Sequence, residues 1–230
     1  MPAAAVNLLG DFFAGLATFF FPSRCRGCGN ELDGGGPRLL CPACRAVLGA
    51  PFPESGISGC LIRSGETAEY GRFPYDGPAG TAVRLLKFDG VRELAPALAA
   101  ALTPLAAAVA AAYGLGIIAP VPLHPRRRRE RRFNQSEELG ARVARATGLA
   151  YEPKLLRRVR YTRPQVELKG HERIANVAGA FATTRSLGGG RVLLVDDVIT
   201  TGATVRECGR ALKEAGAAVV VAAAAARAGT

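Results

Sequence analysis

Residues 191–204 constrain the fold of this chain more than any other segment. An apolar run over residues 192–195 ends in two adjacent carboxylates, Asp196 and Asp197, and a small, hydroxyl-rich turn then leads into helical spacing. Strand, acidic edge, loop and helix in this order are typical of a parallel α/β sheet, in which ligands bind beyond the carboxyl ends of the strands. We therefore expect an α/β fold with a ligand site at this turn.

The turn has the composition of a phosphate-binding loop: Thr200, Thr201, Gly202, Ala203 and Thr204. Its backbone N–H groups and hydroxyls, with the N-terminus of a helix behind them, can hold a phosphate. The two carboxylates before it are badly placed for phosphate but suit ribose hydroxyls or a hydrated Mg²⁺. A ribose 5-phosphate would satisfy both halves of such a site. The alternative is an ordinary buried strand followed by a polar turn.

The whole run resembles the 5-phosphoribosyl-1-pyrophosphate (PRPP) binding motif of type I phosphoribosyltransferases. The resemblance implies that residues 200–204 bind the phosphate of PRPP. It also implies that Asp196 and Asp197 are the catalytic carboxylates, holding the ribose together with Mg²⁺. A Walker A loop is excluded, because the chain contains no Gly-Lys-Ser or Gly-Lys-Thr.

Four of the six cysteines form two Cys-x-x-Cys pairs, separated by twelve residues that include three consecutive glycines. Two such pairs on tight turns predict a tetrahedral zinc site, which is structural because protein thiolates would fill every position. Two disulfides, which need an oxidising compartment, and unrelated thiols are the alternatives. Cys208 is predicted to be a core residue, whereas Cys60 is either a remnant of another knuckle or simply buried. The predicted ligands are Cys25, Cys28, Cys41 and Cys44.

Composition leaves several functions open. A chain of 230 residues with 49% hydrophobic residues can bury a substantial core, and its net charge of +11 favours polyanionic partners: nucleic acid, phosphorylated metabolites or an anionic surface. The alternative is that the arginine-rich surface merely keeps the protein soluble. The apolar stretch 6–21 lacks a basic leader and is short for a membrane span, so it predicts a packed or interfacial helix. We expect a cytoplasmic protein with no membrane span.

Basic residues gather in two connections. Six arginines fall within the seven residues 126–132, just after a predicted strand that ends near His124. Such density favours an anion, either pyrophosphate or a nucleic-acid backbone, over a solvated loop. A second polar connection, residues 154–177, could close over a diphosphate. The predicted pyrophosphate or nucleic-acid ligands are His124, Arg126, Arg132, Lys169 and Arg173.

The blocks Pro120-Val121-Pro122-Leu123-His124, Arg132-Phe133-Asn134-Gln135-Ser136 and Arg173-Ile174-Ala175-Asn176-Val177, followed by residues 191–204, resemble the ComF (GntX-type) family. This resemblance implies a phosphoribosyltransferase-like domain with an N-terminal zinc ribbon, associated with natural competence and DNA uptake. The family's usual Arg-Gly-Phe-Asn-Gln turn has Arg132 in place of glycine here. We expect that change to restrict the turn or to displace Phe133.

Several element bounds follow from the same patterns. We expect an N-terminal helix and zinc ribbon over 1–60, and a phosphoribosyltransferase-like parallel sheet flanked by helices over 61–230. Strands are predicted within 116–121, 191–196 and 217–223, with an edge strand or hood within 61–90. Further predictions are a helix over 137–148 capped by Ser136, a helix ending at Gly216 after the phosphate loop, and a break at Pro104 in the alanine-rich tract.

Two functions remain in view. One is a PRPP-dependent transferase that releases pyrophosphate, although no aromatic hood for a nucleobase is recognisable in the sequence. The other is a non-catalytic protein that binds single-stranded DNA or a nucleotide through the same loop, in contact with DNA-uptake proteins. The sequence specifies neither the acceptor substrate nor an oligomeric state.

Overall fold

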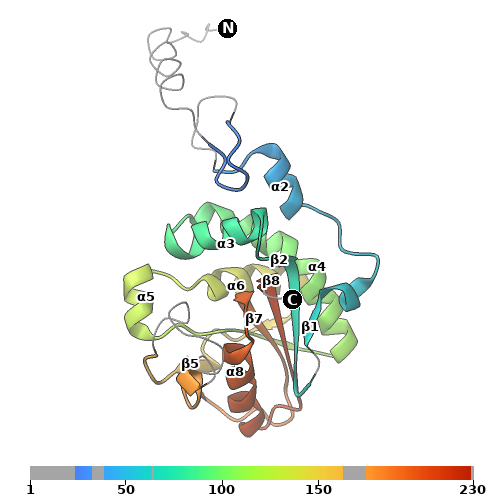
Figure 1. Cartoon of the computed structure of the whole chain (residues 1–230). Coiled ribbons are helices and arrows are strands. Elements are labelled where there is room, and N and C mark those ends of the chain that lie inside the picture. The colour runs from blue at the N-terminus through green and yellow to red at the C-terminus, as the bar shows by residue number, and fades with distance from the viewer. Residues whose placement is uncertain (1–23, 33–38, 64, 163–174, 229–230) are drawn as a thin grey trace, which may run out of the picture.

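The core of the fold is a six-stranded sheet in the order β1-β2-β8-β7-β3-β4, seen in a computed structural model that describes residues 24–32, 39–63, 65–162 and 175–228 (Figure 1). Neighbouring strands are parallel except β1 and β2, and β5 and β6 form a separate antiparallel pair. The strands are β1 Leu61–Arg63, β2 Thr67–Pro74, β3 Ile117–Pro120, β4 Ala150–Tyr151, β5 Leu156–Arg158, β6 Phe181–Thr183, β7 Arg191–Ile199 and β8 Val219–Arg227.

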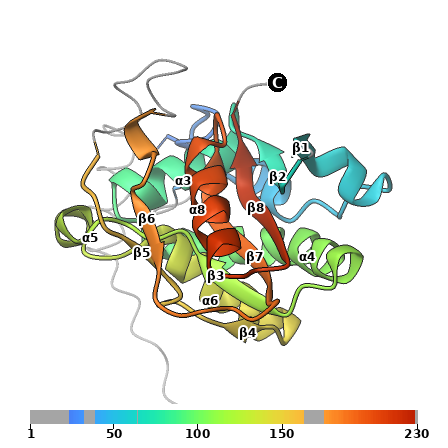
Figure 2. The same cartoon turned by 90° about the horizontal axis from the view of Figure 1, so that it is seen from below.

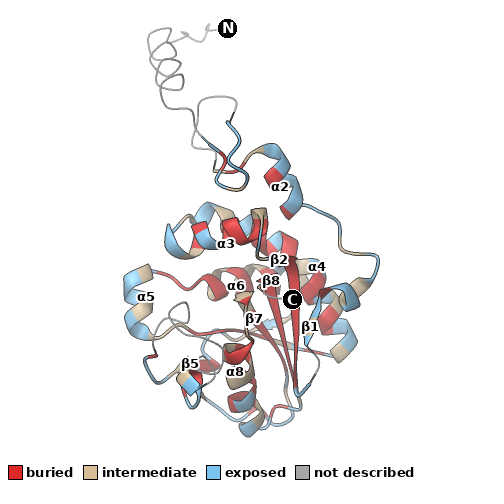
Figure 3. Ribbon diagram, viewed as in Figure 1, coloured by how far each residue is buried: buried red, intermediate tan, exposed pale blue. Residues whose placement is uncertain are grey.

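Helices cover both faces of the sheet, and an apolar cluster lies on each side (Figure 2). One cluster joins β7 and β8 to α3, α4 and α6, and the other joins the opposite faces of the same strands to α8 and the β5–β6 pair. Figure 3 shows the central strands buried and the arginine-rich α5 exposed. The helices are α2 Pro42–Leu48, α3 Pro78–Phe88, α4 Ala95–Tyr113, α5 Pro125–Arg131, α6 Gln135–Thr147 and α8 Ala203–Glu214, with short 3₁₀ turns at Gly56–Cys60 and Arg92–Leu94.

The predicted parallel sheet flanked by helices is confirmed, and each of the three predicted strands is present. β8 is formed largely of alanine, a residue that favours helices. Because β8 lies between β2 and β7 and its alanines are buried, tertiary packing decides its conformation. The segment 61–90 supplies the edge strand β1, and β2 lies inside the sheet, between β1 and β8.

Two predicted helix boundaries are wrong. The N-cap of α6 is Asn134 rather than Ser136, because the Asn134 side-chain oxygen accepts a hydrogen bond from the Ser136 backbone N at 3.1 Å. This arrangement leaves the Ser136 hydroxyl available for the site described below. The helix α8 ends at Glu214 rather than at Gly216, because Gly216 already turns left-handed with a φ of 90°.

The predicted break at Pro104 is also wrong, since α4 runs continuously from Ala95 to Tyr113 through that proline. Proline removes one helical N–H, whose partner would be the carbonyl of Ala100. Both residues lie on the exposed side of the helix, where water can bond that carbonyl. Within the described part of the chain, Arg92–Tyr113 is the one helical stretch long and apolar enough to cross a membrane, and half of it is buried inside the protein, as in a core helix.

The cysteine-bearing segment joins the same core. Cys44 and Leu48 of α2 are buried in the cluster that contains α3 and α4, and Cys60 lies there as well. Cys208 is fully buried in the cluster under α8, as predicted for a core residue. The predicted N-terminal helix lies outside the described residues.

Candidate functional site

A cavity of about 700 Å³ opens at the carboxyl ends of β3 and β7. Residues 121–123 after β3 line one side, and the whole turn 200–204 after β7 lines another. The end of α3, two arginines of α5, the start of α6 and Arg158 of β5 form further parts of the wall. Parallel strands bring the turn and both aspartates to one edge of the sheet, so the predicted loop and carboxylates share a single cavity.

The turn after β7 is held in shape by an ion pair between buried Glu69 and partly exposed Arg206. Gly202 adopts a left-handed conformation with a φ of 74°, and a Cβ atom there would lie 2.2 Å from a carboxylate oxygen of Glu69. Glu69 is 1% exposed and accepts a 2.7 Å bond from Arg206, which also donates to the carbonyl of Thr201 at 2.7 Å. Arg206 thereby fixes the turn from behind, and only glycine fits at position 202.

One side-chain oxygen of this turn lacks a partner. The Oγ1 atom of Thr201 is buried and makes no hydrogen bond within the described part of the protein. A buried hydroxyl without a partner costs about 1–3 kcal/mol. A bound ligand or an ordered water that supplied the missing partner would remove this cost.

The two aspartates are held by different neighbours. Asp196 Oδ1 accepts bonds from the Ser136 hydroxyl at 2.8 Å and from the backbone N of Asp197 at 2.9 Å. Asp197 is 2% exposed, and its Oδ1 atom lies 2.9 Å from the Nζ atom of Lys87, at the end of α3. Burial, with the adjacent Asp197 charge, raises the pKa of Asp196 to about 7, although Lys87 and Ser136 partly oppose the rise.

Three arginines bring positive charge to the cavity. Arg127 and Arg131 lie four residues apart on α5 and therefore on one face, and Arg158 comes from β5. Burial lowers the pKa of Arg131 and of Arg158. Removing a guanidinium group from water costs free energy, and a bound anion would offset that cost. These arginines therefore favour an anionic ligand.

The arginine run forms the helix α5, and two of its outward arginines pair with acids. Arg126 bonds Glu130 at 3.2 Å, and Arg128 bonds Glu137 at 2.6 Å. Helical spacing thus divides the run into two cavity-facing residues and an exposed outer face.

The sequence-predicted basic residues fall in different places. His124 caps α5 through its Nδ1 atom, which accepts a bond from the Arg126 backbone N at 3.2 Å, and its ring packs against Tyr161. His124, Arg126 and Arg132 lie outside the described lining of the main cavity. Arg132 lines a separate cavity of about 360 Å³. The predicted ligands Lys169 and Arg173 lie outside the described residues.

The substitution at the family's glycine position has a different consequence from the one expected. Arg132 has a φ of 65° and is the one non-glycine residue with positive φ in the described part of the chain. Phe133 nevertheless remains buried, with 8% exposure. The arginine therefore accepts the left-handed conformation that glycine would adopt freely, and the phenylalanine is not displaced.

Sequence reasoning missed six residues of the cavity whose side chains carry charge or hydrogen bonds. The helical period of 3.6 could have selected the two arginines of α5 from their neighbours. No local sequence pattern indicates that Lys87, at the end of α3, contacts an aspartate more than a hundred residues away. The missed residues are Lys87, Arg127, Arg131, Gln135, Ser136 and Arg158.

The four predicted metal ligands come together. Their Sγ atoms all lie within 4.8 Å of one another, and the Cys28 and Cys41 sulfurs are 3.7 Å apart. Four sulfurs at about 2.3 Å from a zinc ion would lie about 3.8 Å from each other. A Cβ atom at Gly27 would lie 2.8 Å from the Cys44 sulfur, so the first knuckle requires glycine there. The donor set and spacing fit a tetrahedral metal ion.

Backbone N–H groups also point at these sulfurs. Gly27 N and Cys41 N donate to Cys25 Sγ at 3.3 and 3.2 Å, and Cys44 N donates to Cys41 Sγ at 3.4 Å. These backbone bonds outweigh the opposing effect of burial and lower the pKa of Cys25 to about 6. N–H donors stabilise thiolates, the form that binds metal.

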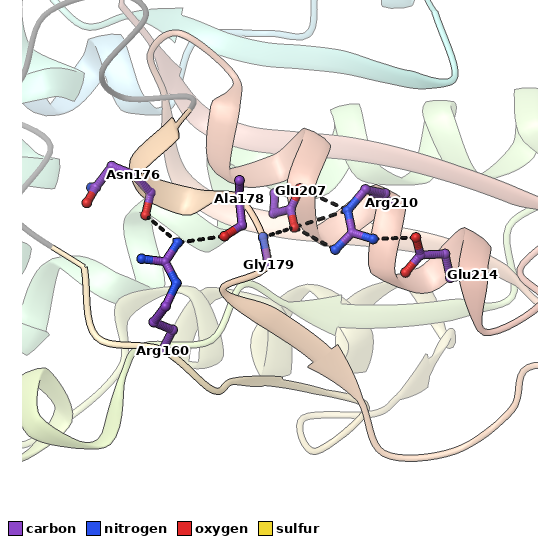
Figure 4. A network of polar contacts seen from close by, with 7 residues as sticks. All are labelled: Arg160, Asn176, Ala178, Gly179, Glu207, Arg210 and Glu214. Carbon is purple, nitrogen blue, oxygen red and sulfur yellow. Dashed lines mark hydrogen bonds and ion pairs between the residues drawn. The ribbon is translucent and has the colours of Figure 1, made fainter.

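A polar network anchors the chain beside α8 (Figure 4). Arg160 donates to the backbone carbonyls of Asn176 and Ala178, so it ties the end of β5 to the chain that leads into β6. Gly179 N donates to Glu207 of α8 at 2.6 Å, and Glu207 in turn pairs with Arg210. The contacts fix the wall that carries Arg158.

Known proteins resemble this chain along most of its length. A phosphoribosyl transferase domain model matches residues 134–230. The DNA utilization protein YhgH of Salmonella typhi is 35% identical over 185 residues, which cover 79% of this chain and 81% of that protein. YhgH of Escherichia coli K12 is 34% identical over 64% of this chain and 66% of its own length. Competence protein F of Haemophilus influenzae is 35% identical over 43% of this chain and 44% of its own length. The chain belongs to the ComF family of phosphoribosyltransferase-like proteins.

Proposed function

We propose that the main cavity binds PRPP, or a closely related phosphorylated ribose, together with Mg²⁺. The observation that carries this proposal is that the hydroxyl-rich turn 200–204 and both aspartates line one cavity of about 700 Å³. A ligand with phosphate at one end and vicinal hydroxyls beside it uses both halves at once. Cavities of this size accommodate small phosphorylated metabolites.

The 5-phosphate belongs on the turn. The N-terminus of α8 carries a partial positive charge there, and its first N–H groups have no partner within the helix. The buried Thr201 hydroxyl has no partner among the described residues and supplies a further donor. A phosphate oxygen would satisfy that hydroxyl.

The ribose belongs at the aspartates. Carboxylate oxygens accept bonds from ribose hydroxyls and coordinate Mg²⁺. In the free protein Lys87 provides the positive charge next to Asp197. Mg²⁺, when bound, would supply charge neutralisation to a diphosphate and to the carboxylates. Asp196 and Asp197 are the residues that would hold it.

The diphosphate belongs near the arginines. Arg127, Arg131 and Arg158 approach the cavity and would stabilise the negative charge of a pyrophosphate group. The same charges would favour pyrophosphate as a leaving group, with the aspartates stabilising an oxocarbenium-like sugar. Phosphoribosyl transfer is therefore the reaction that this cavity suits.

Calorimetry with PRPP and Mg²⁺ tests the site. We expect saturable one-to-one binding, and a tenfold to hundredfold loss of affinity in Thr201→Val, because a hydrogen bond to a charged group contributes about 1.5–3 kcal/mol. Thr103→Val is the matched control, since that hydroxyl bonds the Ala99 carbonyl within α4. Absence of heat with the unmodified protein would refute the proposal. Equal affinities of the two variants would show that the phosphate does not bind at this turn.

The cysteine cluster is proposed to hold one structural zinc ion. All four thiolates would be used, which leaves no position for water or substrate. Metal analysis under reducing conditions should give about one zinc per chain, and Cys44→Ser should lose it, whereas Cys208→Ala, a buried cysteine outside the cluster, should retain it. Retention of zinc by Cys44→Ser would contradict this assignment.

The cellular role that we propose is DNA utilization during competence, in the cytoplasm, by analogy with the named relatives. The outward arginines of α5 are the residues that would meet a DNA backbone. Binding of a fluorescent single strand should weaken steeply with salt, and Arg129→Ala should reduce the slope of log affinity against log salt by about 0.7. An unchanged slope would show that Arg129 of α5 does not contact the DNA backbone.

A further inference from the structure

Phe88 stands apart from the other apolar side chains of the protein. It is 58% exposed, more than any other large hydrophobic residue in the described ranges, and it lines the main cavity. An aromatic ring open to water forgoes the free energy of burial, roughly 25 cal/mol per Å². At the wall of a ligand cavity, such a ring is positioned to be covered by the ligand.

The backbone on either side of Phe88 is held in place. The preceding residue, Lys87, pairs with Asp197, and its carbonyl accepts a 3.3 Å bond from the buried side chain of Gln135. The following residue, Asp89, pairs at 2.9 Å with Arg26, which lies between Cys25 and Cys28 of the cysteine cluster. The ring is therefore presented from a fixed helix end rather than from a loop.

The guanidinium of Arg131 lies over the Phe88 ring, with Cζ 5.3 Å from the ring centroid. Both residues line the same cavity as the aspartates and the turn 200–204. A ring with a guanidinium over one face and its remaining surface exposed forms a flat, electron-rich platform. Planar heterocycles stack on such aromatic and arginine surfaces with little dependence on their hydrogen-bonding pattern.

Resting on the proposed function, we infer that Phe88, together with Arg131, stacks against the nucleobase of a 5′-nucleotide whose phosphate occupies the turn 200–204. The ligand of the cavity then carries a planar base as well as a phosphorylated sugar. It also supplies the aromatic hood that was not recognisable in the sequence. The same chemistry is offered by a free mononucleotide and by the 5′-phosphorylated end of a DNA strand.

Titration calorimetry of the whole 230-residue chain with AMP and ribose 5-phosphate tests the platform. We expect AMP to bind about tenfold more tightly than ribose 5-phosphate, as one stacked base provides. Phe88→Leu, which keeps an apolar side chain but loses the ring, should reduce that ratio to about one while leaving ribose 5-phosphate binding unchanged. Phe88→Tyr should restore the ratio. The control Leu61→Ala removes an exposed apolar side chain of β1, outside the cavity lining, and should behave as the unmodified protein.

The outcomes separate the two proposals. If PRPP and ribose 5-phosphate bind but Phe88→Leu keeps the preference for AMP, the stacking platform is refuted and the phosphate site stands. If neither PRPP nor ribose 5-phosphate binds the unmodified protein, the proposed function itself fails. A 5′-phosphorylated trinucleotide distinguishes the two sources of the base. If it binds as tightly as AMP, the platform accepts the end of a DNA strand. If it does not bind while AMP does, the platform accepts a free nucleotide.

Discussion

Replacing Asp196 by asparagine should make the protein more stable at neutral and alkaline pH. Asparagine has the same shape and keeps an oxygen that can accept the bonds from Ser136 and from the backbone N of Asp197. It removes the negative charge that lies, partly buried, beside Asp197. The substitution therefore isolates the free-energy cost of holding two adjacent carboxylates in one cavity.

The magnitude follows from the pKa of Asp196, which burial and Asp197 raise from 3.8 to about 7. Between about pH 5 and pH 7 the folded protein retains this proton, whereas the unfolded chain has mostly lost it. The free energy of unfolding contributed by Asp196 therefore falls as pH rises, by about 1.4 kcal/mol per pH unit, or roughly 3 kcal/mol over this window. The asparagine side chain does not titrate, so the advantage of the variant grows by that amount.

Urea unfolding of both proteins at several values between about pH 5 and pH 8 measures the effect. We expect the difference in the free energy of unfolding, variant minus unmodified protein, to rise by roughly 3 kcal/mol across this range. Asp76→Asn, which removes an exposed carboxylate, is the control. A difference that stays flat with pH would refute the claim that burial and Asp197 raise the pKa of Asp196.

Three further substitutions test local geometry. Gly27→Ala should lower the zinc content, because the new methyl group would lie 2.8 Å from a cluster sulfur; metal analysis measures this. Arg132→Gly should raise the free energy of unfolding by about 1 kcal/mol, because it relieves a left-handed arginine with a φ of 65°; urea unfolding measures this. Gly202→Ala should weaken PRPP binding at least tenfold, because its Cβ atom would lie 2.2 Å from the Glu69 carboxylate and displace the turn; calorimetry measures this.

Two of these substitutions, Gly27→Ala and Arg132→Gly, have a matched control. Gly49→Ala places its methyl group no closer than 3.6 Å to another residue and should keep the zinc. Arg129→Gly, inside α5, should lower stability by about 1 kcal/mol instead of raising it. Normal PRPP affinity in Gly202→Ala would show that the turn does not contact the ligand, and a stability loss in Arg132→Gly would contradict the strain at that residue.

The sequence predicted the parts of the fold and site that depend on neighbouring residues. The strand, acid pair and turn of 191–204 are contiguous, so one local pattern predicts both the end of β7 and the start of α8. The cysteine pairs are equally local, and the four sulfurs do come together within 4.8 Å. In each case a short-range geometric requirement selects the residue types.

Contacts between distant segments could not be predicted in this way. Lys87 lies 110 residues before Asp197, and only the packing of α3 on the sheet brings the two together. The arginine run shows the same limit at shorter range, because whether Arg126 or Arg127 faces the cavity depends on the start of α5 at Pro125. The boundary errors at Asn134 and Pro104 arose because tertiary context and solvent exposure outweighed the local signals.

The central claim is that the turn 200–204 and the two aspartates share one phosphorylated ribose. A crystal structure of the protein grown with PRPP and Mg²⁺ tests it most directly. We expect electron density for the 5-phosphate against the Thr201 hydroxyl and the start of α8, with the ribose hydroxyls at Asp196 and Asp197. Density for PRPP elsewhere on the protein, with the turn and the Lys87–Asp197 pair unchanged, would contradict it.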